Sequence, residues 1–487
     1  MSKFNSTVVG KTKTVNKAGG EAHVQSEIYE FIAIALTSFL KDSFYESGNE
    51  TLKRLQKLIK NVKDKELVAK TAVYARNVYG LRSISHVIAG DIANSVKGEA
   101  WVRRFINKVV RRPDDMSEII AYYLKVHGKK LPNPLKRGIA DAFGKFDEYQ
   151  LAKYRGENKA VKLVDIVNLT HPFPTEKNKE ALKKLVNGTL VSKDTWEVEL
   201  SEAGKNVDKK EKSLEDLKSE AWDNLIKEEK LGYLALLRNL RNILENCKDD
   251  VVDLAIKQLT NKEKIKKSLV FPFQFTTAYK QIEDVDVDGA KAGDMLTAIS
   301  DACEISLENV PVLEGKTLVA LDCSGSMSGR PSEIASLFAA VLKKVNGSNC
   351  DLLSFSDDAQ YEKLNTKDTV ITIANNMNFR SGGTDFNKIF EVANKPYDRI
   401  IILSDMQSWV GYNTPAKYFN VYKAKYDCSP KVISFDLAGL GTLAFPEKDV
   451  YQLFGFSDKV FDIMKFLETD KDAVIKEIQT KINFTEE

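Results

Sequence analysis

The chain has few cysteines and no long apolar run. Its five cysteines, spread over 487 residues, never occur in a CxxC spacing, so we expect reduced core residues and neither a disulfide framework nor a zinc knuckle. No apolar stretch approaches the roughly 20 residues of a membrane-spanning helix, and residues 1–7 form no signal-peptide core. With an ordinary 43% of hydrophobic residues, the sequence predicts a cytoplasmic protein of two or more domains.

Positive charge is concentrated in the first third of the chain, although the net charge is only +3. Residues 1–150 contain 26 lysines and arginines against 16 aspartates and glutamates, a balance of +10, which leaves −7 for the remainder. Between Trp101 and Arg137, ten basic residues face three acidic ones. Such a concentration indicates a surface that binds a polyanion.

A basic helix is predicted over residues 99–112 in this region. Helical spacing would place four cations on one stripe, with apolar residues broadly opposite: Arg104, Lys108, Arg111 and Arg112. Stacked cations repel one another unless an anion or solvent relieves them, so the stripe is either a nucleic-acid contact or a solvated helix face. The polyanion surface would also include Lys129, Lys130, Lys136 and Arg137.

A cluster of oxygen-bearing side chains follows the apolar run at residues 318–321. The run leads directly into Asp322-x-Ser324-x-Ser326. That order places a carboxylate and two hydroxyls in a tight turn at the carboxyl end of a strand, where open α/β sheets bind ligands. Hard oxygen donors suit Mg²⁺ or Mn²⁺ and suit Zn²⁺ poorly, so the turn predicts a site for a hard divalent cation.

Two later segments have the form needed to complete this site. Thr384 lies in a glycine-bearing loop ahead of an amphipathic run, and Asp405 ends a second apolar strand. With the turn they resemble the metal-ion-dependent adhesion site of von Willebrand factor A domains, whose five positions match in order: Asp322, Ser324, Ser326, Thr384 and Asp405. The alternative, a tight turn without metal, leaves Thr384 and Asp405 unexplained.

Enzymatic interpretations of the turn fit less well. Cys323 precedes a glycine-bearing turn and Arg330, an order similar to the cysteine phosphatase loop. Six residues separate the two here rather than five, and the carboxylate of Asp322 would raise the pKa of the thiol. A phosphate-accepting aspartate would need a second aspartate at position 324, which is serine. We expect a ligand-binding or structural metal and no catalytic residue.

The two halves of the chain differ in their periodicity. Residues 24–310 are dominated by amphipathic helical patterns separated by Gly, Pro or Asn: 26–42, 51–61, 66–79, 99–112, 116–126, 134–143, 177–187, 210–226 and 231–246. Such a series predicts a helical-repeat solenoid, although no clean sequence period is present. The C-terminal half alternates helices with strands near 316–322, 350–356, 399–404 and 431–437, which predicts a doubly wound α/β domain.

Three other segments stand apart from these patterns. Residues 1–20 are predicted to be a flexible polar tail. The lysine-rich segment Ser201–Ser213 is predicted to be a surface loop. Val270–Phe275 is an aromatic cluster broken by Pro272, and we expect it to pack in the core rather than to stack on nucleic-acid bases.

Several blocks of the helical half are similar to those of a known family. They are Leu131–Phe146, Gln150–Arg155, Lys162–Pro172, Thr195–Gly204 and Leu236–Asn242, and they resemble the TROVE domain. With the adhesion-type site downstream, the resemblance covers nearly the whole chain in the domain order of the Ro ribonucleoprotein family. It implies a TROVE domain over 21–310 and a von Willebrand A-like domain over 315–487, in a bacterial or phage-borne member.

The resemblance also implies an architecture and a function. In that family HEAT-like helical repeats close into a monomeric ring, clasped by the von Willebrand A-like domain. A basic outer surface would bind small structured Y-like RNAs, and a central hole would admit single-stranded 3′ ends of misfolded RNAs, for RNA quality control or processing without chemistry. A ribonuclease or another protein is implied as a partner at the metal site.

The family-like blocks carry further candidate RNA contacts. The resemblance assigns them to Lys153, His171, Arg76, Arg82 and His86. The alternative is a capping role for His171 and, for Arg82, contacts with helix carbonyls. Arg238, Arg241 and Asn242 share a polar helix face that either lines the hole or pairs with acidic segments. The alternative function is a protein-interaction scaffold whose solenoid binds an acidic protein surface and whose metal site does the main recognition.

Overall fold

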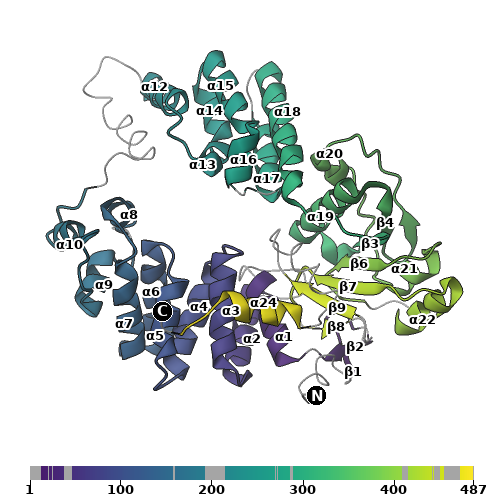
Figure 1. The fold of residues 1–487 in the computed structure, drawn as a ribbon, viewed down its shortest axis with the longest axis horizontal. Helices are drawn as coiled ribbons and strands as arrows, with labels where there is room; N and C mark the ends of the chain where they lie inside the picture. Colours follow the sequence, from purple (N-terminus) through teal and green to yellow (C-terminus); the bar gives the residue numbers. More distant parts are fainter. Residues whose placement is uncertain are drawn as a thin grey trace.

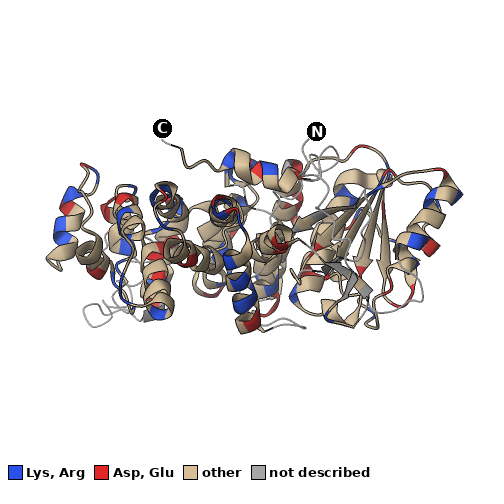
Figure 2. Cartoon of the chain, turned by 90° about the horizontal axis from the view of Figure 1, so that it is seen from below, with Lys and Arg blue, Asp and Glu red and all other residues tan. Residues whose placement is uncertain are grey.

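A ring of helices is joined to an α/β domain in the computed structural model (Figure 1). The structure describes residues 13–19, 21–24, 26–37, 47–156, 159–191, 214–268, 270, 272–285, 289–408, 415–440, 442–443, 450–454 and 472–485. Seen edge-on, the ring is flat (Figure 2). Within these ranges, no helix has the length and apolar character that crossing a bilayer requires.

The helices form two blocks that follow the ring in chain order (Figure 1). The first block consists of α1 (Glu27–Thr37), α2 (Gly48–Asn61), α3 (Lys65–Asn77), α4 (Ser83–Ser95), α5 (Trp101–Val109), α6 (Pro113–His127), α7 (Asn133–Phe143), α8 (Glu148–Lys153), α9 (Leu163–Thr170) and α10 (Lys179–Val186). The second consists of α12 (Leu214–Lys227), α13 (Tyr233–Arg238), α14 (Leu240–Asn246), α15 (Asp249–Leu259), α16 (Lys262–Ser268), α17 (Pro272–Glu283) and α18 (Gly289–Ser306). Helices near in sequence pack together, as α4 does with α6 and α5 with α7.

The contact between α5 and α7 depends on a glycine. A Cβ atom at Gly138 would lie 2.6 Å from the carbonyl oxygen of Arg103 and 2.6 Å from the Cβ atom of Ile106. Real Cβ atoms do not come so close to backbone, so any other residue would push the two helices apart. Phe105, Ile106 and Ile139 fill the resulting interface and are fully buried. Close packing of this kind transmits small displacements along the block.

The predicted basic helix is shorter than expected, and its charged stripe does not form. Helix α5 ends at Val109, and Arg112 has the extended backbone angles φ −133° and ψ 152°. Pro113 is the first residue of α6, and proline disfavours helical angles in the residue before it. Arg111 and Arg112 therefore lie in a connector rather than on the face that carries Arg104 and Lys108, and the stripe prediction is wrong.

The α/β domain contains a six-stranded sheet in the order β5-β4-β3-β6-β7-β9. Its strands are β3 (Thr317–Asp322), β4 (Cys350–Phe355), β5 (Ala359–Tyr361), β6 (Arg399–Ser404), β7 (Lys431–Asp436) and β9 (Val450–Phe454). All neighbours are parallel except β4 and β5. The strand predictions for β3, β4, β6 and β7 are confirmed within one residue. Helix α19 (Arg330–Asn346) follows the turn after β3, and α20 (Val370–Asn375), α21 (Asn387–Val392) and α22 (Pro415–Tyr426) complete the domain.

Segments from both ends of the chain tie the α/β domain to the first helical block. Strand β2 (Glu21–Val24) pairs with β1 (Lys13–Val15) on one side and with β8 (Thr442–Leu443) on the other. Helix α24 (Ala473–Lys481) lies against α3. Beyond it, the ring of Phe484 stacks on Trp101 with centroids 5.8 Å apart.

The prediction of a flexible tail over residues 1–20 is wrong in part. Lys13–Val15 pairs with β2, and β2 pairs with β8 near the other end of the chain, whereas the sequence predicted a tail through residue 20. The distant partner of β2 leaves no local signal in the sequence. Residues 1–12 lie outside the described ranges, as does the predicted loop Ser201–Ser213. In the aromatic cluster at α17, Phe275 is fully buried in the core as predicted, whereas Phe273 is half-buried and lines a cavity.

Candidate metal centre and nucleic-acid interface

The candidate metal residues come from loops at one edge of the sheet. Asp322 is the last residue of β3, and Asp405 directly follows β6. Because β3 and β6 are parallel neighbours, their carboxyl ends meet at the same edge. Ser324 and Ser326 lie in the turn after β3, with their hydroxyl oxygens 3.3 Å apart.

Backbone contacts bring the Thr384 loop to the same edge. The N–H of Gly325 donates to the carbonyl of Gly382 at 3.2 Å, and Ser381 donates to the carbonyl of Cys323 at 3.1 Å. Gly382 has φ +104°, and a Cβ atom there would lie 2.5 Å from a carboxylate oxygen of Asp357. Only glycine fits this position. The structure thus gathers all five predicted residues on three adjoining loops.

Strained backbone occurs in two of these loops. Ser381 has φ 62° and Met406 has φ 60°, values that side-chain-bearing residues rarely adopt. Such conformations cost roughly 1–3 kcal/mol each and cluster at functional sites. Met406 directly follows Asp405, and its N–H donates to the hydroxyl of Ser404 at 3.0 Å. The strain therefore fixes the direction in which the Asp405 carboxylate leaves the strand.

Both carboxylates of the candidate metal centre are buried. Asp322 is fully buried and Asp405 is 2% exposed. Asp322 accepts from the Ser404 hydroxyl at 2.5 Å and from the Ser324 N–H at 2.9 Å. Burial, and then the charge of Asp405, raise the pKa of Asp322 to about 7, and burial raises the pKa of Asp405. None of the ion pairs among the described residues involves either group.

This donor set fits a hard divalent cation. A bound Mg²⁺ or Mn²⁺ would offset the repulsion between two buried carboxylates, and hydroxyl oxygens would supply further ligands. Across the described ranges, no three His, Cys, Asp or Glu side chains converge, so a metal here depends on Ser324, Ser326 and Thr384. The thiol of Cys323 is buried, and burial raises its pKa to about 12. That shift argues against a nucleophilic Cys323.

A third buried carboxylate lies near the same edge. Asp436 ends β7 and accepts the N–H groups of Ala438 and Gly439 at 3.0 and 2.7 Å. Burial raises its pKa to about 7. Gly439 in turn accepts from the guanidinium of Arg54 in α2 at 2.6 Å. Asp436 therefore shapes the loop through which the sheet contacts the first helical block.

The change Asp436→Asn is expected to stabilise the metal-free protein at pH 8 by on the order of 1 kcal/mol and to have little effect at pH 4, near the unfolded pKa of about 3.9. Because the folded-state pKa is raised, the stabilisation linked to Asp436 is full below its unfolded pKa and is lost as the pH rises through 7. Urea unfolding at both pH values in EDTA measures the difference. Asp398→Asn, at an exposed carboxylate that accepts the Lys316 N–H, is the control. A pH-independent effect of Asp436→Asn would contradict the assignment.

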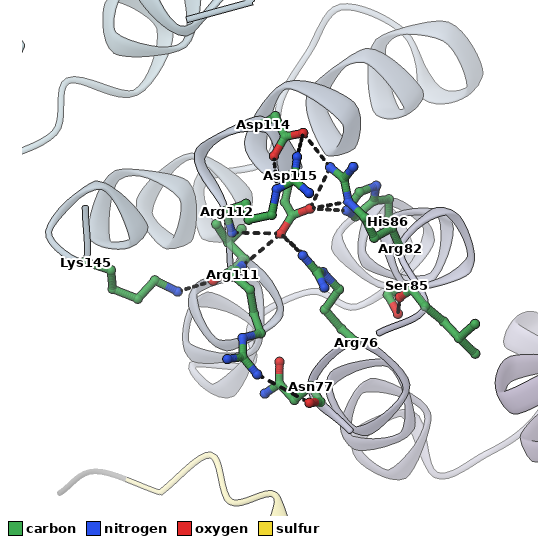
Figure 3. A network of polar contacts seen from close by, with 12 residues as sticks. Arg76, Asn77, Arg82, Ser85, His86, Arg111, Arg112, Asp114, Asp115 and Lys145 are labelled. Atoms are coloured by element: carbon green, nitrogen blue, oxygen red, sulfur yellow. Dashed lines mark hydrogen bonds and ion pairs between the residues drawn. The ribbon is translucent and has the colours of Figure 1, made fainter. Parts of the chain in front are cut away.

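Three predicted RNA contacts converge on one buried carboxylate in the helical half (Figure 3). Arg76 donates to Asp115 from Nε and Nη2 at 3.2 and 2.9 Å, and Arg82 donates to Asp115 at 3.1 Å and to Asp114 at 2.8 Å. The Nε2 atom of His86 lies 3.0 Å from Oδ1 of Asp115, the oxygen that Arg82 also contacts, whereas Arg76 donates to Oδ2. Arg76 and His86 are 8% and 5% exposed. We call this group, with Arg112, the Asp115 cluster.

Asp115 also organises the connector that carries Arg111 and Arg112. It accepts the backbone N–H of both residues at 2.9 Å. These bonds, with those from Arg76 and His86, hold the pKa of Asp115 far below its usual value against the opposing effect of burial. The Arg112 side chain pairs with Asp114. Arg82 therefore donates to carboxylates and not to helix carbonyls.

The outer side of the Asp115 cluster presents cations around an aromatic ring. The guanidinium of Arg112 lies 4.5 Å from the ring centroid of Tyr154, and the Nζ atom of Lys153 lies 5.8 Å from it. Lys159 approaches Asp114 at 4.0 Å and pairs with Glu118 at 2.6 Å. Arg82, Arg112 and Lys159 are each about one-third or more exposed. The four cations Arg82, Arg112, Lys153 and Lys159 thus outnumber the three acids Asp114, Asp115 and Glu118, and ion pairs or ring contacts hold each of the four.

The other predicted RNA contacts are dispersed. Lys108, Lys129, Lys130, Arg137 and His171 are exposed, and Lys136 is half-buried. Arg104 donates from Nε to the carbonyl of Phe484. His171 ends α9 in the left-handed conformation, with φ 48°, as its capping alternative predicted. Arg241 pairs with Glu245 at 2.8 Å, whereas Arg238 lines a cavity.

The sequence interpretation missed Asp114, Asp115 and Tyr154. The two aspartates carried a usable signal, because Pro-Asp-Asp is a typical helix start and marks α6 at residue 113. Their contacts with Arg76, Arg82 and His86 span 29 to 39 residues, and no spacing rule predicts these. Tyr154 lies in the family-like block Gln150–Arg155, but the sequence alone indicates no role for its ring.

Comparison with known proteins assigns both halves of the chain. Residues 34–217 and 189–345 match the TROVE domain, and residues 316–467 match the Ro60 vWA domain. The architecture is therefore that of a TROVE domain followed by a von Willebrand A-type domain. Since the TROVE match covers more than half of the chain, the protein belongs to the TROVE-domain family, as its sequence blocks predicted.

Relatives support the assignment at low identity. The RNA-binding protein RO60 of Deinococcus radiodurans is 26% identical over 259 residues, which are 48% of each chain. Telomerase protein component 1 of Mus musculus is 26% identical over 294 residues, 45% of this chain but 11% of that protein. The chain thus spans about half or less of these curated relatives. The crystal structure of the D. radiodurans Ro protein has a TM-score of 0.59 at 16% identity, covering 91% of this chain and 99% of that one, which shows a shared ring fold.

Proposed function

We propose that this protein is an RNA-binding ring that acts without chemistry. The observation that carries the proposal is the outer side of the Asp115 cluster, where Arg112 and Lys153 flank the Tyr154 ring and Arg82 and Lys159 lie nearby. Fixed guanidinium and ammonium groups beside an aromatic ring bind RNA phosphates and stack on unpaired bases. RNA binding by the D. radiodurans relative supports the same function.

The finer proposal concerns which RNA binds and where. We propose that small structured, Y-like RNAs bind this basic outer surface and that single-stranded 3′ ends of misfolded RNAs enter the ring, for quality control or processing. Structured RNA is recognised largely through its shape and phosphates, whereas a single strand can follow a charged channel. A ribonuclease or another protein would then act as a partner, by supplying an acidic ligand to the metal.

A direct test is a titration of nucleic-acid-free protein with structured RNAs that carry or lack a single-stranded 3′ tail, at two salt concentrations. Salt-sensitive binding of both RNAs, tighter for the tailed one, is the expected result, because counterions are released when phosphates are neutralised. If neither RNA bound, the protein-scaffold alternative would replace this proposal. Tail-independent binding would remove the proposed role of the ring interior.

The double change Arg112→Gln with Lys153→Gln should weaken RNA binding and reduce the slope of log affinity against log salt by about 1 to 2. The variant removes both charges but keeps polar side chains, and Asp114 keeps its ion pair with Arg82. Lys262→Gln with Lys264→Gln, on exposed pairs with Glu308 and Glu229, is the matched control. An unchanged slope in the first variant would exclude these residues from the interface.

A further inference from the structure

A cavity of about 540 Å³ lies where the two helical blocks meet the α/β domain. Its walls come from α1, the turn between α3 and α4, α13, α17 and α19 (Figure 1). Cavities of this size accommodate small molecules, which typically need about 300–1,000 Å³. No residue of the metal site or of the Asp115 cluster lines it, although Arg238, a candidate for the ring interior, does. The cavity is therefore separate from the two sites described above.

The floor of the cavity is apolar and its aromatic walls are fixed. Leu81, Leu237 and Ala278 are buried there. The ring of Phe273 packs against buried Phe338 with centroids 5.2 Å apart, and Tyr79 packs against buried Tyr74 at 5.8 Å. Rings held by such neighbours are ready for stacking, because little conformational entropy is lost when a planar ligand binds.

The charge of the lining is of one sign. Arg238 and Arg330 both line the cavity, and none of the described residues that line it is acidic. Glu333, whose charge acts on Arg330, also pairs with Lys280 at 2.6 Å. Burial lowers the pKa of Arg330, which remains a cation, so its charge is poorly solvated and would interact strongly with an anion. Gln274, Thr277 and Gln281 add hydrogen-bonding groups.

We propose that this cavity binds a nucleotide unit, with its base against Tyr79 and Phe273 and its phosphate toward Arg238 and Arg330. A planar, uncharged body with hydrogen-bonding edges matches the aromatic walls and amide groups, and the phosphate matches the arginines. The unit is either a free nucleotide or the terminal nucleotide of a single strand, because both present the same chemistry. The inference depends on neither the outer RNA surface nor the metal.

The test is equilibrium binding of AMP, and of a five-residue oligoadenylate, to the full chain in EDTA. Thr277→Trp would fill the cavity from its exposed rim and should abolish binding. Thr297→Trp is the matched control, because Thr297 is also exposed on a helix and makes the same hydroxyl contact four residues back. Arg330→Gln should weaken binding about tenfold or more through loss of a charge-assisted contact.

Three results can be distinguished: a site for a free nucleotide, a site for the end of a strand, and no nucleotide site. Binding of AMP that is lost in Thr277→Trp assigns a free-nucleotide site. Binding of the oligonucleotide alone, with the same loss, assigns the end of a strand. The proposal is overturned if neither probe binds, or if Thr277→Trp and Arg330→Gln leave binding unchanged. Titration with structured RNA tests the outer surface separately, so failure of one proposal does not imply failure of the other.

Discussion

Replacing Asp115 with alanine is expected to destabilise the first helical block by roughly 3–5 kcal/mol, the usual cost of removing one partner from a buried ion pair. The reason is that Arg76 and His86 are almost fully buried and Asp115 is their acceptor. The change also leaves the backbone N–H groups of Arg111 and Arg112 without this acceptor. Urea unfolding followed by circular dichroism at pH 7 would measure the loss in the first transition.

Asp141→Ala is the matched control for this experiment. Asp141 also accepts two guanidinium bonds, from Arg103 at 2.6 and 2.7 Å, but the pair is one-third to one-half exposed. Solvent screening limits exposed pairs to about 0–1 kcal/mol. Equal effects of the two changes would contradict the central role of Asp115.

The contribution of Asp115 should also depend on pH in a defined direction. Its folded-state pKa is lowered, so its stabilisation is present above the unfolded pKa of about 3.9 and is lost as the pH falls below that value. Comparing Asp115→Asn with the unmodified protein at pH 7 and pH 3 would show the difference shrinking in acid. A difference that grew in acid would mean that another group titrates in its place.

The second large effect is expected at the sheet edge. Asp322→Ala should abolish binding of Mg²⁺ or Mn²⁺, because it removes one of only two carboxylates in the proposed donor set. Manganese binding can be followed by the loss of the free-ion electron paramagnetic resonance signal. Asp358→Ala, at an exposed carboxylate of the same domain, should bind metal normally. The metal proposal fails if the unmodified protein binds no Mn²⁺ or if Asp322→Ala still does.

RNA binding by the same variant separates the roles of the two halves. We expect Asp322→Ala to retain affinity for structured RNA, because the outer side of the Asp115 cluster is built from the residues that precede α4 and α6 and from the end of α8, remote from the sheet edge in sequence. Loss of RNA affinity together with metal would mean that the sheet domain takes part directly in RNA recognition. The division proposed here would then be wrong.

The sheet domain was largely predictable because its signals are local. Strands β3, β4, β6 and β7 are continuous apolar runs, as expected for strands buried on both faces. The order of the DxSxS turn, Thr384 and Asp405 places all five residues at one edge once the strands are parallel. Strands β1, β2 and β8 were missed, since they have two to four residues and β2 pairs with β8 across the molecule. The three-residue strand β5, which pairs with the neighbouring β4, and the strand β9 were missed as well.

The sequence predicted that the first part of the chain is helical, but it did not predict the contacts between its helices. Helix α4 was not singled out, because residues from Ile84 to Ala93 are buried around the whole helix and a helix buried on all sides has no amphipathic pattern. The supposed stripe ignored Pro113, which fixes the start of α6 and thereby the end of α5. The sequence suggested that Arg76 and His86 are surface cations, because their partner Asp115 lies 39 and 29 residues away from them along the chain.

The closing contacts between the ends of the ring impose an order on folding. The hydroxyl of Tyr29 in α1 donates to Asp472 at 2.8 Å across 443 residues of chain. At a synthesis rate of about 5–20 residues per second, α1 exists for roughly 20–90 s before this partner is made. The helices of the first block must therefore remain soluble as an open arc during translation. Pairing over such a distance is intrinsically slow, so closure is expected to be the last and slowest step of folding.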